Sequence, residues 1–228
     1  MALSKITLEL NKKTLEIGKK LSLNNKILKS DIDALKDLNF NHYFSKVNGL
    51  GTGITGSFKK NLRDFSDAKV AKMMNEMNTI SKVDLLTKLE KSLEGLMARY
   101  NQDWLEAEAN IIEGKVMGVK QWEGYMETFK DNKNATLTYV TANDDKVREE
   151  HEALDGFTAA VDDPIWMTID PPEWDWNCRC TLVLNQDEDI VDNSEDYGDV
   201  LNYGGSDDIA DNAYYTGKIF SEEHGYFQ

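Results

Sequence analysis

The sequence predicts an α+β protein, with a helical N-terminal half followed by a small mixed α/β C-terminal module that ends in an acidic, loop-rich tail. Two patterns predict this. Through the first half, apolar residues recur every three or four positions, which is the spacing of helices that bury one face. After a polar turn the pattern becomes alternating and β-branched, as in strands. We therefore expect a helical region at 1–134 and a module at 135–228.

Within the helical region, one helix is expected to start near Asp31, where a serine and an aspartate have the spacing of a helix cap. The strongest periodicity covers residues 83–129, where leucines and aromatic residues form a long stripe. Gly114 and Gly118 are candidate breaks that divide this stretch into two helices.

The module is expected to start with a strand at 136–141, because threonine alternates there with leucine, tyrosine and valine. A short helix is predicted at 145–154, ending at Gly156, and a second strand at 180–184. From 185 to 211 the chain is acidic and poor in large aliphatic residues, so loops are expected.

Composition excludes several classes of protein. The chain has 228 residues, and no run reaches the roughly 18 to 20 apolar residues that a membrane span needs. The N-terminus lacks the apolar core of a signal peptide, so we expect a protein kept in the cytoplasm where it is made. Both cysteines lie in a C-x-C pair, a poor geometry for a disulfide, which favours a reducing compartment.

The net charge of −15 is distributed unevenly. Residues 1–70 hold 13 basic and 7 acidic side chains, whereas residues 141–228 hold 4 basic and 23 acidic ones. Because phosphate contacts need lysine and arginine, the C-terminal part is a poor candidate for gripping nucleic acid. The mildly basic N-terminal third could touch DNA or an acidic partner, but a solvated lysine-rich helical surface is the preferred interpretation.

The first candidate for chemistry is a metal site built from His151, Cys178 and Cys180. Imidazole and thiolates suit zinc, but a structural zinc site usually has four ligands and no fourth is obvious here; His224 is the only chemically natural addition. The alternative is a buried, hydrogen-bonded histidine beside two small apolar thiols. Both interpretations stay open at this point, so zinc is a candidate cofactor and no other cofactor is indicated.

A second cluster combines opposite charges near these residues. We expect Arg148 or Arg179 to pair with an aspartate and hold the surrounding loops in place. Arg148 and His151 are three residues apart and are expected on one side of a helix. No order of nucleophile, base and oxyanion hole is recognisable, so no catalytic residue is assigned. The aspartates of this cluster are Asp144, Asp155, Asp162 and Asp163.

Prolines and tryptophans follow in the same segment. They predict an irregular packed loop, and aromatic anchors of this kind are also common in partner interfaces. The residues are Pro164, Trp166, Pro171, Pro172, Trp174 and Trp176. A glycine-rich sequence at 51–56 fits a dinucleotide-binding pattern, but it follows a helical segment and no strand, so a hinge is the better prediction.

The ordered motifs between Tyr139 and Cys180 resemble those of the phage Mu F-like minor head proteins. The stretch T-A-x-D, V-R-x-x-H-x-x-L-D-G, D-D-P-x-W, P-P-x-x-W and N-C-R-C carries the resemblance. The matching positions include Thr141, Asp144, Arg148, His151, Asp155, Asp163, Trp166, Asn177, Cys178, Arg179 and Cys180. A weaker similarity to the end of some relatives appears in residues 217–227.

The resemblance implies a non-enzymatic structural protein of a tailed bacteriophage that acts in head morphogenesis near the portal. Its expected partners are the portal protein, the major capsid or scaffold protein and, through the N-terminal third, packaged DNA; no membrane is involved. Its expected location is the virion, with the host cytoplasm during assembly. Two alternatives are a metal-dependent enzyme or effector delivered by the phage, and a small zinc-stabilised binding module.

Overall fold

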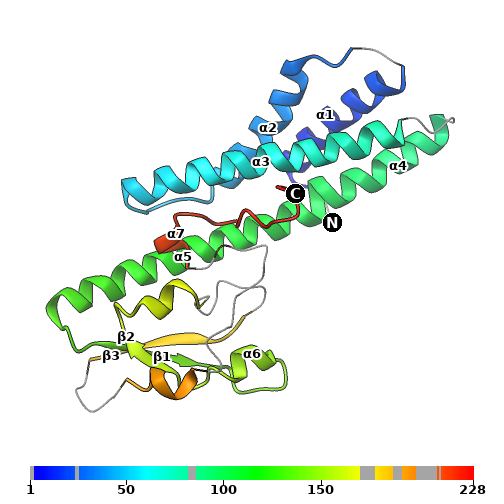
Figure 1. Cartoon of the computed structure of the whole chain (residues 1–228). Helices are drawn as coiled ribbons and strands as arrows, with labels where there is room; N and C mark the ends of the chain where they lie inside the picture. Colours follow the sequence, from blue (N-terminus) through cyan, green and yellow to red (C-terminus); the bar gives the residue numbers. More distant parts are fainter. Residues whose placement is uncertain are drawn as a thin grey trace. The chain divides into compact units, whose positions relative to one another are not determined.

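Helices occupy most of the chain up to Asp131, and a small sheet follows, so the predicted α+β class is confirmed (Figure 1). The computed structural model describes residues 3–23, 26–81, 86–169, 178–186, 192–198, 210 and 212–228. The long helices are α1 (Lys5–Ser22), α2 (Lys29–Phe44), α3 (Thr52–Ile80), α4 (Leu86–Ala98) and α5 (Trp104–Asp131), with a π-helical segment η1 (Arg99–Asp103) between the last two.

The chain divides into two compact units. The helical unit comprises Met1–Asn48, Lys59–Ile112 and Gly225–Gln228, and the sheet unit comprises Gly49–Phe58 and Glu113–His224. The division falls inside α3 and inside α5. The predicted domain boundary after residue 134 stays a prediction.

The helical unit is held by buried apolar side chains from every long helix in it. Leu10, Leu35, Phe65 and Leu93 are fully or almost fully buried. Helix α1 also packs closely on α4: a Cβ added at Gly18 would lie 2.6 Å from a methyl group of Leu93. A larger residue at position 18 would therefore require the Leu93 side chain to shift.

Three details of the helices differ from the prediction. Helix α2 begins at Lys29, because the side chain of Asp31 accepts the backbone N–H of Leu28 and caps the helix from inside its first turn. The break in the long helical stretch is the π-helical segment η1, whereas α5 continues through both predicted glycine breaks. The glycine-rich sequence at 51–56 is no hinge, because α3 begins inside it at Thr52.

The sheet has three antiparallel strands in the order β2-β1-β3. Strands β1 (Thr136–Val140) and β3 (Thr181–Asn185) match the two predicted strands closely, and Tyr139 of β1 faces Leu182 of β3. The third strand, β2 (Thr158–Ala160), was not predicted. Its three residues are too few to show alternation.

The helix predicted at 145–154 is reduced to the single turn α6 (Glu149–Glu152). Asp144 accepts the backbone N–H of Lys146 at 2.9 Å, which forms a turn, and Arg148 is extended with ψ 150°. Gly156 then adopts φ 81°, a conformation that other residues rarely accept, and leads into β2. The chain therefore uses two turns where the pattern predicted one helix.

The core of the sheet unit is rich in aromatic side chains. Trp122 of α5 packs edge-on against Trp166, with ring centroids 6.0 Å apart, and both side chains are buried. Trp166 lies in η2 (Pro164–Met167), and its indole N–H donates to the carbonyl of Ala160 at 2.8 Å. The second half of α5, β1 and the segment after β2 thus share one core.

The remaining described elements are the short η3 (Ser194–Tyr197) and α7 (Ala213–Thr216). Most of the predicted acidic loop region at 185–211 lies outside the described residues. In the part of the chain that the structure describes, no helix is long and apolar enough to cross a membrane.

Candidate metal centre

The cluster lies where the segment before β3 meets α6. Cys180 directly precedes β3, and the antiparallel pairing of β3 with β1 fixes its position. His151 is the third residue of α6 and packs its ring edge-on against Tyr139 of β1, with centroids 6.1 Å apart. The sheet therefore places residues 27 to 29 positions apart in the sequence beside each other.

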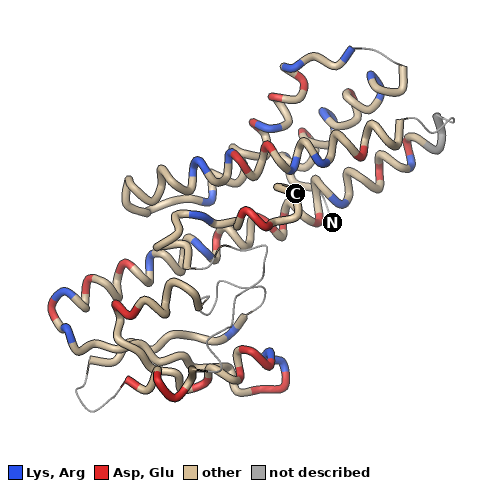
Figure 2. Tube along the Cα trace, in the orientation of Figure 1, with Lys and Arg blue, Asp and Glu red and all other residues tan. Residues whose placement is uncertain are grey.

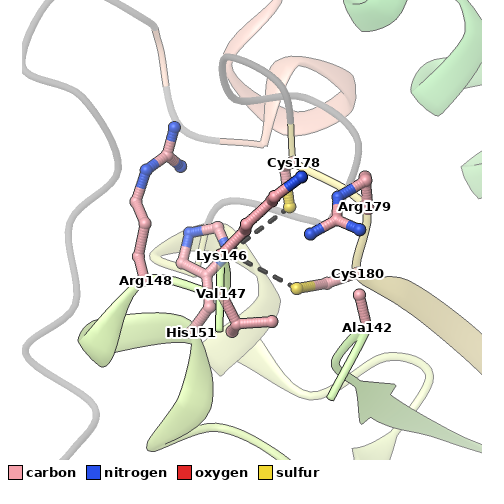
Figure 3. Close-up of a pocket in the computed structure, with 8 residues that line it drawn as sticks. All are labelled: Ala142, Lys146, Val147, Arg148, His151, Cys178, Arg179 and Cys180. Atoms are coloured by element: carbon pink, nitrogen blue, oxygen red, sulfur yellow. Dashed lines mark hydrogen bonds between the residues drawn. The ribbon is translucent and has the colours of Figure 1, made fainter. Parts of the chain in front are cut away.

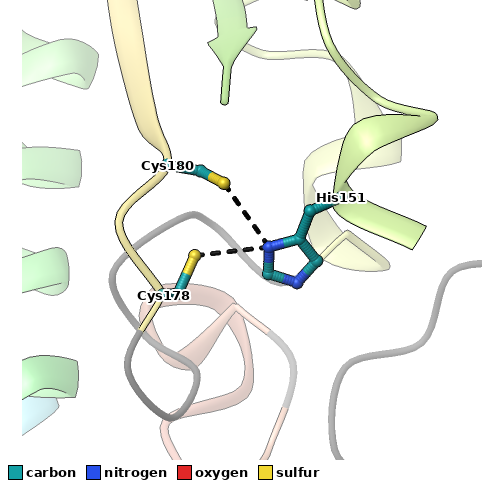
Figure 4. A group of neighbouring side chains, drawn as sticks. All are labelled: His151, Cys178 and Cys180. Atoms are coloured by element: carbon teal, nitrogen blue, oxygen red, sulfur yellow. Dashed lines mark hydrogen bonds between the residues drawn. The ribbon is translucent and has the colours of Figure 1, made fainter. Parts of the chain in front are cut away.

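The three potential ligand atoms converge. His151 Nδ1 lies 3.3 Å from the sulfur of Cys178 and 3.5 Å from the sulfur of Cys180 (Figure 4). All three atoms lie within 4.8 Å of one another. His151 and Cys180 are buried, and Cys178 is half-buried. Among the described residues, this is the group of histidine, cysteine and acidic side chains close enough to share a metal ion.

These distances are compatible with a shared metal ion as well as with hydrogen bonds. One imidazole nitrogen carries either one proton or one lone pair, so it can form a good hydrogen bond with one sulfur and not with both. A nitrogen and a sulfur bound to the same tetrahedral zinc lie about 3.6 Å apart, given the usual zinc–ligand distances. The two observed separations are close to this value.

A pocket of about 370 Å³ opens beside the cluster. The two cysteines and His151 form one part of its wall, and basic side chains form another (Figure 3). Lys146 reaches toward Cys178, whereas Arg148 points to the opposite side of His151. The eight described residues that line the pocket include no carboxylate, so they offer no acidic general base; they are Ala142, Lys146, Val147, Arg148, His151, Cys178, Arg179 and Cys180.

Arg179 is the arginine that pairs with an aspartate. Its two terminal nitrogens donate to the two oxygens of Asp144, both at 2.6 Å. The Arg179 guanidinium, together with the backbone N–H of Lys146, lowers the pKa of Asp144 to about 2. Because Arg179 stands between the two cysteines in the sequence, this bidentate pair fixes the segment that carries both sulfurs.

The other predicted motif residues of this segment have structural contacts. Asp155 accepts the backbone N–H of Thr141 at 2.8 Å and its hydroxyl at 3.0 Å, which ties the end of β1 to the turn after α6. Asp163 caps η2 by accepting the N–H of Ile165 at 2.8 Å, and this places Trp166 in the core. Asp162 is exposed.

Several predicted residues are not part of this cluster. His224, the one chemically natural addition to the three ligands, is outside the group of converging atoms and packs on Phe220 with centroids 5.5 Å apart. Pro171, Pro172, Trp174, Trp176 and Asn177 lie outside the described residues.

The helical unit also contains a buried polar network that the sequence did not predict. Lys69 and Glu108 form an ion pair with side-chain exposures of 1% and 8%. The hydroxyl of Tyr43 donates to the same carboxylate, and Tyr226 donates to its other oxygen at 2.7 Å. The sequence did contain an indication of this network. Lys69 and Glu108 each lie four residues from buried apolar side chains, and therefore on the buried face of their helices.

The fold and this cluster define a class of protein: a helical region joined to a small antiparallel module with a histidine–cysteine centre. The family described as Phage Mu protein F like protein matches residues 68–183, just over half of the chain. The chain belongs to this family. The family is one of bacteriophage structural and head morphogenesis proteins and is not a known enzyme family.

One similar protein is the Mu-like prophage FluMu F protein of Haemophilus influenzae. It is 52% identical over 44 residues, which are 19% of this chain and 10% of the relative. The chain therefore matches about a tenth of the length of that curated relative. No solved structure matches the chain. The matched family region includes all three residues of the candidate metal centre.

Proposed function

We propose that this chain is a minor head protein of a tailed bacteriophage that acts in head morphogenesis close to the portal vertex. The family match over residues 68–183 carries the proposal, because it spans α4, α5 and the sheet as far as β3. Membership of a phage head family also implies association with the virion. On this proposal the chain assembles in the host cytoplasm and is packaged in the head, from which it can leave with the DNA.

The organisation of the sheet unit supports a structural role. Its motif aspartates cap turns and pair with an arginine, and its central tryptophans are buried against each other. Each of these polar groups is used inside the unit to fix backbone. An enzyme would instead leave such groups poised around a substrate pocket.

The helical unit offers a surface for docking on the portal, capsid or scaffold protein. One face of α1 exposes Leu8, which is 54% accessible, together with Lys12 and Lys19. These positions recur at helical spacing on one side of α1. Figure 2 shows basic residues spread over α1, α2 and α3, and acidic residues gathered around α6. The same basic face is the candidate contact with packaged DNA.

Co-purification with the portal protein of the same phage tests the proposal. We expect the wild-type chain to bind the portal, and the double variant K12E/K19E to bind at least about 10-fold more weakly if the α1 face is the docking surface. The matched control K130E/K218E makes the same charge change at exposed positions of the sheet unit and should bind like wild type.

Mass spectrometry of purified virions gives the independent readout. The proposal predicts peptides of this chain at low copy number relative to the major capsid protein. Absence from virions, together with no binding to the portal, would contradict the proposed role.

A further inference from the structure

We infer that His151 Nδ1, Cys178 Sγ and Cys180 Sγ form a binding site for a thiophilic divalent metal ion, with zinc as the ion of choice. This inference is independent of the proposed role in the phage head. It rests on the convergence of two cysteine sulfurs on one imidazole nitrogen, at 3.3 and 3.5 Å, and on the burial of His151 and Cys180.

The ligand types select the metal. Two thiolates and an imidazole are ligands that zinc prefers, whereas calcium and magnesium require oxygen ligands. A different part of the structure positions each of the three side chains. His151 lies in α6, Cys180 directly precedes β3, and Cys178 is adjacent to Arg179, which pairs with Asp144. The fold therefore holds the three ligand side chains close together, which lowers the entropic cost of binding an ion.

The supporting contacts have the form expected around a metal ligand. Tyr139 limits the rotation of the His151 ring by packing edge-on against it. The bidentate pair of Arg179 with Asp144 ties the C-x-C segment to the turn before α6. Outer partners of this kind orient metal ligands and commonly change affinity by about 10- to 100-fold when they are removed.

A bound ion would cross-link two segments of the sheet unit. It would join α6 to the segment before β3, which are more than 25 residues apart in sequence and share no strand pairing of their own. Because the unfolded chain cannot hold the three ligands together, binding free energy becomes folding free energy. Three described ligands leave one tetrahedral position, and the pocket beside them gives access for a water molecule or an external ligand.

Cobalt substitution of the full chain tests the inference directly. The purified, reduced protein is treated with a chelator and titrated with Co²⁺. We expect thiolate-to-cobalt charge-transfer absorption and intense visible bands of a tetrahedral ion, both saturating at one ion per chain and lost when Zn²⁺ is added. The melting temperature should rise by at least about 5 °C when free zinc reaches about 100 times its dissociation constant.

Variants assign the ligands. C178S and C180S should each lower the charge-transfer absorption and weaken zinc binding by more than about 100-fold, beyond the loss expected for a supporting residue. H151A should weaken binding to a similar degree. The matched controls H224A and H42A remove the other histidines and should bind zinc like wild type.

Two results would overturn the inference. One is a wild-type chain that is folded by circular dichroism but gives neither cobalt charge-transfer bands nor a zinc-dependent shift in melting temperature. The other is a folded H151A variant that binds zinc as tightly as wild type. Because a cysteine variant can fail to fold, the wild-type cobalt spectrum decides the question by itself.

Discussion

The two units each contain a cluster of ionisable side chains, and the clusters differ in the kinds of group that they bring together. In the helical unit, Glu108 receives hydrogen bonds from Lys69, Tyr43 and Tyr226, so both carboxylate oxygens have partners from the chain. In the sheet unit, Cys178 and Cys180 both approach one nitrogen of His151 beside an open pocket. Partners from the chain on both oxygens of a buried carboxylate are typical of a structural network, whereas two thiols and an imidazole nitrogen that converge have the arrangement of the metal site proposed above.

The position of the Glu108 network explains why the C-terminal residues belong to the helical unit. Tyr226 reaches Glu108, and Lys72 donates to the carbonyl of Gly225 at 2.7 Å. Burial, reinforced by the Glu108 carboxylate, raises the pKa of Tyr43 well above its usual range, so its hydroxyl stays a proton donor. Burial lowers the pKa of Lys69, and the paired carboxylate opposes that shift.

The largest expected effect is the loss of one partner in the buried ion pair. Glu108→Ala leaves the Lys69 ammonium buried without its carboxylate, and we expect the free energy of unfolding to fall by about 3–5 kcal/mol. Urea denaturation of the full chain measures it. The double variant K69M/E108L, which removes both charges, should recover most of this loss. A loss below about 1 kcal/mol for Glu108→Ala would show that the network is not structural.

A loss of similar or slightly smaller size is expected from Trp166→Ala in the sheet unit. The side chain is fully buried between Trp122 and Phe157, so its removal creates a cavity and should cost about 3–5 kcal/mol. Met167→Ala is the matched control: its side chain is 50% exposed, and the change should stay within about 0.5 kcal/mol. Equal losses of unfolding free energy for the two variants would show that Trp166 is not part of the core.

A smaller effect, visible only in acid, is expected from Asp31. Lys20 at 2.7 Å and Lys13 at 3.2 Å lower the pKa of its carboxyl from 3.8 to about 2. A lowered folded-state pKa stabilises the protein above the ordinary pKa, and that contribution is lost as the pH falls from about 4 to 2. Asp31→Asn should therefore flatten the dependence of the urea midpoint on pH in this window. An unchanged slope would contradict the α1–α2 ion pairs.

The smallest expected change in stability comes from Asp144, which is exposed and pairs with Arg179 at the surface. The larger effect of losing this ion pair is expected on zinc binding. Asp144→Asn loosens the segment that carries both cysteines, and we expect zinc affinity to fall by about 10-fold with little change in the melting temperature of the chelator-treated chain. Competition with a chromophoric chelator measures the affinity. An unchanged zinc affinity would show that the Asp144–Arg179 pair does not position the metal ligands.

Sequence patterns predicted the parts of the fold that depend on local periodicity. The strands β1 and β3 were predicted because β-branched and apolar residues alternate there, and the helices because apolar residues recur at helical spacing. The strand β2 was missed because three residues between turns carry no period. The break at η1 was missed because the π-helical segment contains no glycine or proline to mark it.

The candidate site was partly predictable for a similar reason. The residue types of His151, Cys178 and Cys180 fitted both a metal site and a buried core, and only the tertiary structure shows that the three side chains converge. The pairing of Lys69 with Glu108 joins residues 39 apart through the packing of α3 on α5, which no local pattern contains. Long-range polar partners of this kind require the tertiary structure.

Native mass spectrometry of the purified full chain tests the difference between the two clusters most directly. The account predicts a folded species that carries one zinc ion, lost in the variant C178S/C180S and retained in K69M/E108L. A folded wild-type chain that stays free of metal after exposure to zinc, or a C178S/C180S variant that keeps the ion, would contradict it.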